Sequence, residues 1–234
     1  SVTLMASMFS SARSFNADIS KWDVSEAINM DNMFWQATSF TQKLCQANWQ
    51  KTKASKIEMF TGSVGTACTT NFLSRASLKR AVAASLKLSP KGDDSNGPHG
   101  PIGEWDVSSV TNMEKAFDDA SSFNADISNW DVSSVIIMSA MFTGATSFNC
   151  ALSEWDVSNV VDMSAMFRGA AAFNGDISKW DVSSVNTMRS MFARGKLFNN
   201  DISKWDVSKV TTMTSMFKSA TSFNFDISKW DVSN

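Results

Sequence analysis

The sequence predicts an α/β repeat solenoid with a parallel β-sheet on one side, short helices on the other and a helical insertion. Trp recurs every 25 residues, at positions 105, 130, 155, 180, 205 and 230. Phe recurs with the same spacing, at positions 117, 142, 167, 192 and 217. A fixed period of 20 to 50 residues is typical of solenoids, because each unit has an apolar side that it can bury only against its neighbours.

The first part of each unit is predicted to be a β-strand. Trp130 and Val132 are two residues apart and would share one face of a strand, with Asp131 on the other face. Together with Ile127 they match the L-x-x-L-x-L spacing, so the predicted solenoid is leucine-rich-repeat-like. Trp is therefore expected in the core. An exposed aromatic platform for sugars, bases or pigments is the alternative.

The second part of each unit is predicted to be a short helix. Val135, Met138, Met141, Phe142 and Ala145 follow the i, i+3, i+6, i+7, i+10 spacing of one helical stripe. A Ser just ahead of this stripe would serve as the N-cap.

The repeats form two arrays, over residues 1–60 and 102–234, separated by an insertion and loop over residues 61–101. Residues 74–88 have the apolar spacing of a helix that ends before Pro90. We expect this helix to cover the end of one or both stacks, because an open solenoid end presents apolar side chains. Both arrays are cut within a repeat, so we expect the chain to be part of a longer protein.

The unit F-N-x-D-I-S-x-W-D-V-S-x-V-x-x-M-x-x-M-F resembles the 25-residue repeat of the BspA-like leucine-rich repeat proteins. That repeat is of the Mycoplasma surface-protein type and is common in bacterial surface proteins and unicellular algae. The resemblance covers residues 1–60 and 102–234. It implies a curved solenoid with a parallel sheet, used for adhesion or protein contact, and it carries over no catalytic residues.

Composition restricts the classes of function. The 234 residues include 21 basic and 23 acidic ones, with 43% hydrophobic residues, so we expect a folded chain with a sizeable core. No apolar run approaches the roughly 20 residues that cross a bilayer. His99 is the only histidine, and no phosphate loop, nucleophile elbow or Cys/His metal spacing is present. We therefore expect no enzyme, no cofactor and no bound metal.

Two polar rows recur with the period. An Asp follows the Trp of each unit and is expected on the outer face of the sheet; it either forms a cation-binding or ligand-binding strip or accepts local backbone N–H bonds in Asx-type turns. A second Phe recurs in each unit, as at Phe123 and Phe148, and is followed by an Asn, which either builds an amide ladder between coils or contacts a ligand. In the second array the row of Asp residues is Asp106, Asp131, Asp156, Asp181, Asp206 and Asp231.

The interruption of the repeat is strongly basic. Residues 41–91 contain nine basic residues and one acidic residue, a net charge of +8, against −10 for the rest. We predict that this basic joint binds a partner, either an acidic protein or a membrane surface. Nucleic acid is least favoured, because interleaved aromatic residues are missing; a solvated helix face is the alternative. The predicted contact residues are Lys43, Lys51, Lys53, Lys56, Arg75, Lys79, Arg80 and Lys87.

Cysteine spacing leaves two alternatives. Cys45 and Cys68 lie about one coil apart and would either form a disulfide that staples the first array or remain two free buried thiols. Cys150 is expected to be unpaired.

These features predict a non-catalytic repeat scaffold for protein–protein interaction, as a peripheral or linker subunit of a large assembly. The style of the repeat suggests an algal assembly, for example a photosynthetic complex at the chloroplast thylakoid. The alternative is a cell-surface adhesin or glycan-binding protein, which would place the chain on the extracellular surface.

Overall fold

The structure is a computed structural model that describes residues 2–44, 48–49, 52–67, 72–93 and 99–233. The chain divides into two compact units, Ser1–Thr70 and Asn71–Asn234. The boundary lies ahead of the helix that was predicted within a separate insertion over residues 61–101. That helix therefore belongs to the second unit.

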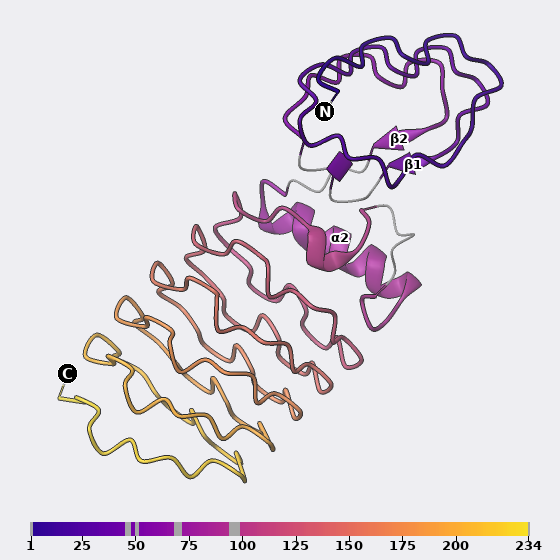
Figure 1. The fold of residues 1–234 in the computed structure, drawn as a ribbon. Coiled ribbons are helices and arrows are strands. Elements are labelled where there is room, and N and C mark those ends of the chain that lie inside the picture. Colours follow the sequence, from indigo (N-terminus) through magenta and orange to yellow (C-terminus); the bar gives the residue numbers. More distant parts are fainter. Residues whose placement is uncertain (1, 45–47, 50–51, 68–71, 94–98, 234) are drawn as a thin grey trace. The chain divides into compact units, whose positions relative to one another are not determined.

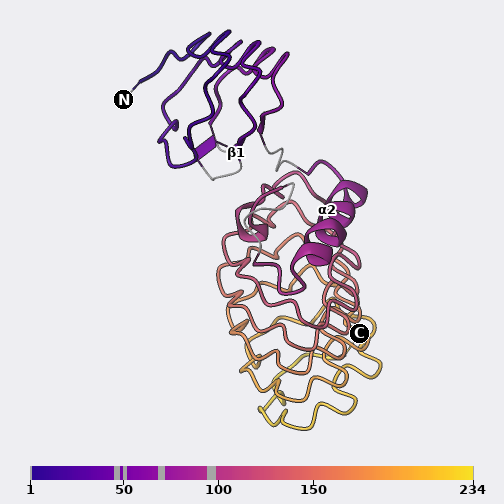
Figure 2. The same cartoon turned by 90° about the vertical axis from the view of Figure 1, so that its right-hand side faces the viewer.

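In the second unit, successive repeats form coils that lie side by side (Figures 1 and 2). Parallel backbone pairing links Asn112 to Ile137, Ile137 to Asp162, Asp162 to Thr187 and Thr187 to Thr212. Each link joins equivalent positions of neighbouring repeats. The 25-residue period of the sequence is thus the register of the stack.

The helical spacing of each repeat produces tight turns and no helix. The N–H of Met141 donates to the carbonyl of Met138, and the N–H of Ala145 to that of Phe142. Each turn contains a residue of positive φ, Ala140 at 54° and Gly144 at 70°. The predicted short helices of the repeats are therefore wrong, although Met138, Met141, Phe142 and Ala145 are all 0% exposed.

Hydrogen bonds between coils explain this difference. The N–H groups of Met138, Ala140, Phe142 and Gly144 donate to carbonyls of the next coil at 2.8–2.9 Å. A helix would direct these donors to carbonyls four residues earlier in the same coil. Because alternate donors point to the neighbouring coil, a turn with the same apolar spacing replaces the helix.

In the regular repeats of the second unit, the predicted strand around the Trp is also a turn. The N–H of Trp130 donates to the carbonyl of Ile127, and the N–H of Val135 to that of Val132. Among the described residues, the named strands are only β1 (Lys43–Leu44) and β2 (Thr66–Ala67), which pair in parallel in the first unit. The row of Asp residues after the Trp therefore lies in turns and does not occupy a sheet face.

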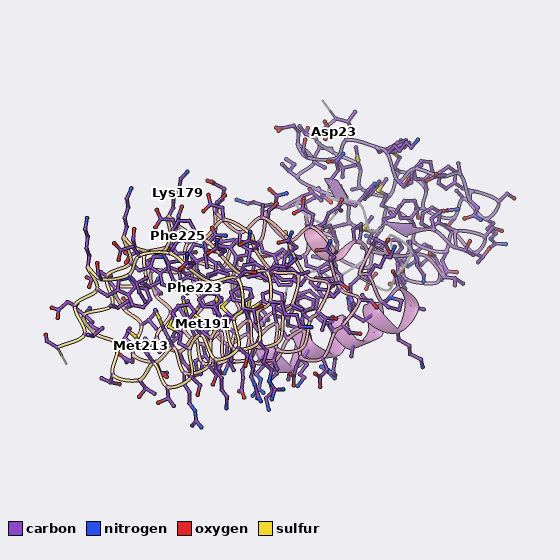
Figure 3. All side chains as sticks on the ribbon, turned by 90° about the horizontal axis from the view of Figure 1, so that it is seen from below. Asp23, Lys179, Met191, Met213, Phe223 and Phe225 are labelled. Carbon is purple, nitrogen blue, oxygen red and sulfur yellow. The ribbon has the colours of Figure 1, made fainter. Side chains whose placement is uncertain are left out.

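Aromatic rings fill the core of the second unit in rows. The rings of Phe142 and Phe148 stack within one coil at 4.0 Å, and Phe142 stacks on Phe167 of the next coil at 5.5 Å. The Trp residues from Trp105 to Trp205 are 3–4% exposed, so they belong to the core as their phase predicted. Figure 3 shows Met191 among the coils and Lys179 at their rim.

Helix α2 (Arg75–Leu88) covers the first coil of the second unit. Ser74 caps its N-terminus and forms a reciprocal capping box with Ser77. The helix buries Leu78 and Val82 in the same core cluster as Trp105. A short 3-10 helix, η1 (Ile102–Glu104), then leads into the first coil.

The first unit repeats this design over fewer coils. Parallel pairing links Leu4 to Asn29 and Asn29 to Ser55. Phe34 stacks on Phe40 at 4.0 Å and on Phe60 at 5.5 Å. None of the helices in the described part of the chain has the length and apolar character needed to cross a membrane.

Candidate functional site

The Asp residues after the Trp act as hydrogen-bond acceptors within their own turns. In every described copy, one carboxylate oxygen accepts the backbone N–H of the Ser two residues later, at 3.0–3.1 Å. The Ser158 hydroxyl and then its N–H lower the pKa of Asp156, and Ser208 does the same for Asp206. The described residues contain no group of three His, Cys, Asp or Glu residues that could hold a metal ion.

The Asn residues after the Phe connect neighbouring coils. The side-chain oxygen of Asn149 accepts the backbone N–H of Asn174 at 2.8 Å, and that of Asn174 accepts the N–H of Asn199 at 2.9 Å. Asn124 and Asn199 make the same bond to the next coil. The row is an amide ladder that satisfies one backbone donor in each coil.

The indole groups make a third connection, which the sequence did not indicate. The Nε1–H of Trp155 donates to the carbonyl of Ile127 at 3.2 Å, and that of Trp180 donates to the carbonyl of Leu152 at 2.9 Å. Each bond spans 28 residues and joins adjacent coils. The absence of Tyr and the recurrence of Trp agree with a core position that needs one donor and a large apolar ring.

The predicted basic joint is distributed over both units. Lys43, Lys53 and Lys56 lie in the first unit, and burial lowers the pKa of Lys56. The Arg75 guanidinium forms an ion pair with Glu114 at 2.9 Å, so it stabilises the contact between α2 and the first coil. Lys79, Arg80 and Lys87 lie exposed on α2, and Lys51 is outside the described residues.

The cysteines do not form a site in the described part of the chain. The proposed partners Cys45 and Cys68 both lie outside the described residues. Cys150 is a free, buried thiol, which donates to the Asp126 carboxylate at 3.4 Å. Burial raises the pKa of the Cys150 thiol to about 11.

The structure brings together a second set of basic residues that sequence reasoning missed. We call it the turn-face groove, because it lies along the turns of three successive coils and has a volume of about 320 Å³. The sequence signal for it is an irregularity of the repeat, since the positions of Arg168, Arg189 and Arg194 carry neutral or acidic residues in earlier coils. It is lined by Ser164, Ala165, Arg168, Arg189, Ser190, Ala193, Arg194, Ser215 and Lys218.

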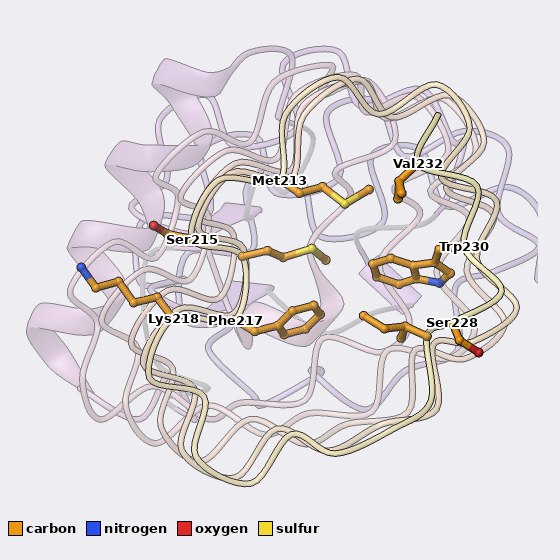
Figure 4. Close-up of a pocket in the computed structure, with 9 residues that line it drawn as sticks. Met213, Ser215, Phe217, Lys218, Ser228, Trp230 and Val232 are labelled. Carbon is orange, nitrogen blue, oxygen red and sulfur yellow. The ribbon is translucent and has the colours of Figure 1, made fainter. Parts of the chain in front are cut away.

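Apolar and polar side chains of the last described coil line a pocket. Figure 4 shows Met213, Phe217, Trp230 and Val232 pointing into the interior of the coil, while Ser215 and Lys218 point outward. The inward residues continue the rows of the preceding coils. The outward ones line the turn-face groove.

Comparison with known proteins identifies the repeat. One family model matches residues 1–71, 93–185 and 149–234, and its description is "Mycoplasma protein of unknown function, DUF285". No curated protein matches the chain. No solved structure matches it either. The matched segments cover most of the chain, and the chain belongs to this Mycoplasma-type repeat family of unknown function.

Proposed function

We propose that the chain is a non-catalytic repeat scaffold that binds other proteins, as a peripheral or linker subunit of a large assembly. We also propose that its repeats are of the BspA-like, leucine-rich-repeat-like solenoid type. The supporting observation is that recurring and variable residues have different positions within each coil. The residues that recur hold the stack together, and the residues that vary lie outside.

The recurring polar groups are already used within the fold. The carboxylate of Asp181 accepts the N–H of Ser183, and the amide oxygen of Asn174 accepts the N–H of Asn199. The indole of Trp180 donates to Leu152. Such groups fix a rigid backbone and leave the intervening positions free to vary, as in other repeat proteins that present extended binding surfaces.

The outward positions vary strongly in charge. One of them, the residue after the first Met of each turn, is Glu114, Ser139, Ser164, Arg189 and Thr214 in successive coils. This position is therefore acidic in the first of these coils, basic in the fourth and neutral in the other three. Varied side chains on a constant backbone favour recognition of specific partners over catalysis, which needs groups of unlike pKa close together.

The exposed cations of α2 are the part of the basic joint best placed for a protein partner. Lys79, Arg80 and Lys87 are exposed, whereas the Arg75 guanidinium is occupied by Glu114. An acidic partner surface would complement them, chiefly by increasing the rate and specificity of association.

The test is purification of the tagged chain from its own organism after mild cross-linking. We expect a stoichiometric protein partner, and we expect Lys79→Gln/Arg80→Gln/Lys87→Gln to reduce its recovery. The matched control is Lys179→Asn/Lys204→Asn/Lys229→Asn, which removes the same charge from exposed turn positions of the second unit. Recovery of the chain as a lone monomer would overturn the proposal. The partner's compartment would distinguish a thylakoid complex from the cell surface.

Glycan binding is the second candidate, and the observation that favours it is the turn-face groove.

A further inference from the structure

The turn-face groove concentrates positive charge on one side of the second unit. Arg168, Arg189, Arg194 and Lys218 are exposed and come from three successive coils. Parallel backbone pairing links neighbouring coils of the second unit, and such pairing has a spacing of about 4.8 Å, so these cations follow one another in short steps along the stack. No carboxylate is among the residues that line the groove.

None of these cations is neutralised within the described part of the chain. There the only ion pair joins Arg75 to Glu114, and no side-chain hydrogen bond of the four basic residues is found. The second unit as a whole carries 15 basic and 18 acidic residues, a net charge of −3. The positive groove is therefore a local feature of a unit that is otherwise acidic.

The fold does not require these residues. At the position of Arg168 the preceding coil has Thr143, and at the position of Arg189 it has Ser164. Arg194 has a φ of 62°, and the two preceding coils place Gly144 and Gly169 at the same position with φ of 70° and 74°. The equivalent residues of two further coils are Asp119 and Ser219, with φ of 59° and 60°, so this turn position accepts several side chains and does not require Arg.

We propose that the turn-face groove binds an anionic polysaccharide. Guanidinium groups present a planar fork of donors that matches sulfate and carboxylate oxygens, and three of the four cations are Arg. Ser164, Ser190 and Ser215 also line the groove, and hydroxyl groups suit the hydroxyl groups of sugars. A series of cations in steps along a groove fits a linear chain that carries repeated negative charges.

The composition of the groove disfavours other polyanions. Protein hot spots are enriched in Trp, Tyr and Arg set in apolar pockets, yet the apolar lining here is limited to the small residues Ala165 and Ala193. Single-stranded nucleic acid binds to aromatic stacking platforms, and the groove contains no aromatic residue. The inference is independent of whether the chain also has a protein partner.

The test measures binding of dextran sulfate and of neutral dextran of equal length to the full chain by isothermal titration calorimetry at low salt. We expect dextran sulfate to bind and neutral dextran not to bind. Alginate, a carboxylated polysaccharide, should compete with dextran sulfate. The groove variant Arg168→Thr/Arg189→Ser/Arg194→Gly uses residues that neighbouring coils carry at the same positions. It should weaken binding by at least about tenfold, since charge-assisted hydrogen bonds are lost.

The control variant Lys179→Asn/Lys204→Asn/Lys229→Asn removes the same number of charges outside the groove, and we expect less than about a twofold effect. Equal losses in both variants, or an unchanged affinity of the groove variant, would overturn the proposal. Tighter binding of polyglutamate, single-stranded DNA or anionic phosphatidylserine vesicles would also overturn it. If the triple variant unfolds, Arg194→Gly alone is used, because Gly suits the backbone there.

Discussion

The indole N–H of Trp180 donates to the backbone carbonyl of Leu152, 2.9 Å away and 28 residues earlier in the chain. The same bond joins Trp155 to Ile127, Trp205 to Ile177 and Trp230 to Ile202. Each of these four Trp residues thus holds its coil to the preceding one with a hydrogen bond as well as by packing. The recurrence of Trp follows from this double role.

Trp155→Phe should lower the stability of the second unit by about 2–4 kcal/mol, because a buried carbonyl loses its donor and a cavity remains beside it. Urea unfolding followed by circular dichroism measures the change. The control is Trp230→Phe, which removes the same type of hydrogen bond from a Trp that is only half-buried. We expect a smaller loss there, and equal losses would show that burial does not set the cost.

Asn174→Ala should weaken the amide ladder by removing the acceptor of the Asn199 N–H. We expect a loss of about 1 kcal/mol and faster hydrogen exchange at the amide of residue 199. Hydrogen–deuterium exchange with peptide-level mass spectrometry detects this locally. Asn186→Ala is the control, since the Asn186 side chain has no hydrogen bond within the described residues. Unchanged exchange at the amide of residue 199 in Asn174→Ala would contradict the ladder.

Acid should destabilise the second unit through the turns formed by Asp156 and Asp206. Hydrogen bonds from Ser158 and Ser208 lower the pKa of these carboxyls in the folded state from the ordinary value of 3.8. Their contribution is therefore present above the unfolded-state pKa and is lost as the pH falls through the folded-state pKa. Because both groups are exposed, solvent screening keeps the effect modest.

Urea titrations between pH 7 and pH 3 test this prediction. Asp156→Asn/Asp206→Asn should flatten the dependence of stability on pH. The control Asp118→Asn/Asp119→Asn removes the same charge from carboxylates that accept no side-chain hydrogen bond in the described part of the chain. A control curve as flat as that of the test variant would refute the assignment.

Ser85→Ala should stabilise α2. The Ser85 hydroxyl is buried on the face that packs on the first coil, and it has no hydrogen-bond partner within the described residues. Removing an unsatisfied buried hydroxyl should raise stability by up to about 1–2 kcal/mol. Thermal unfolding measures the change. Ser74→Ala is the comparison variant and should lower stability by about 1 kcal/mol, because the helix loses its N-cap. A drop in the melting temperature of Ser85→Ala would show that this hydroxyl is bonded.

Cys150 should resist alkylation in the folded protein. Burial raises its pKa to about 11, so the thiolate that reacts is scarce at pH 8. Iodoacetamide labelling with mass spectrometry should modify Cys150 only after unfolding in denaturant. Equal labelling rates in the two states would contradict this prediction.

The same digest, with and without reduction, determines whether Cys45 and Cys68 are joined by a disulfide.

The sequence by itself determined the period, the register and the identity of the inward residues. The two-residue spacing of Trp130 and Val132 and the stripe from Met138 to Ala145 were enough to predict their burial. Whether a side chain points into the core depends on its polarity and on its spacing from other apolar residues, and both can be read from the local sequence. The Asn row was likewise readable, since a repeated amide can bond across a stack.

Only the tertiary structure decided what the backbone does between these residues. The stripe suits a helix and a pair of tight turns equally well, and hydrogen bonds from Ala140 and Phe142 to the next coil select the turns. The turn-face groove arises for the same reason. Stacking at a 25-residue register brings Arg168, Arg189 and Lys218 to one face although they are distant in sequence.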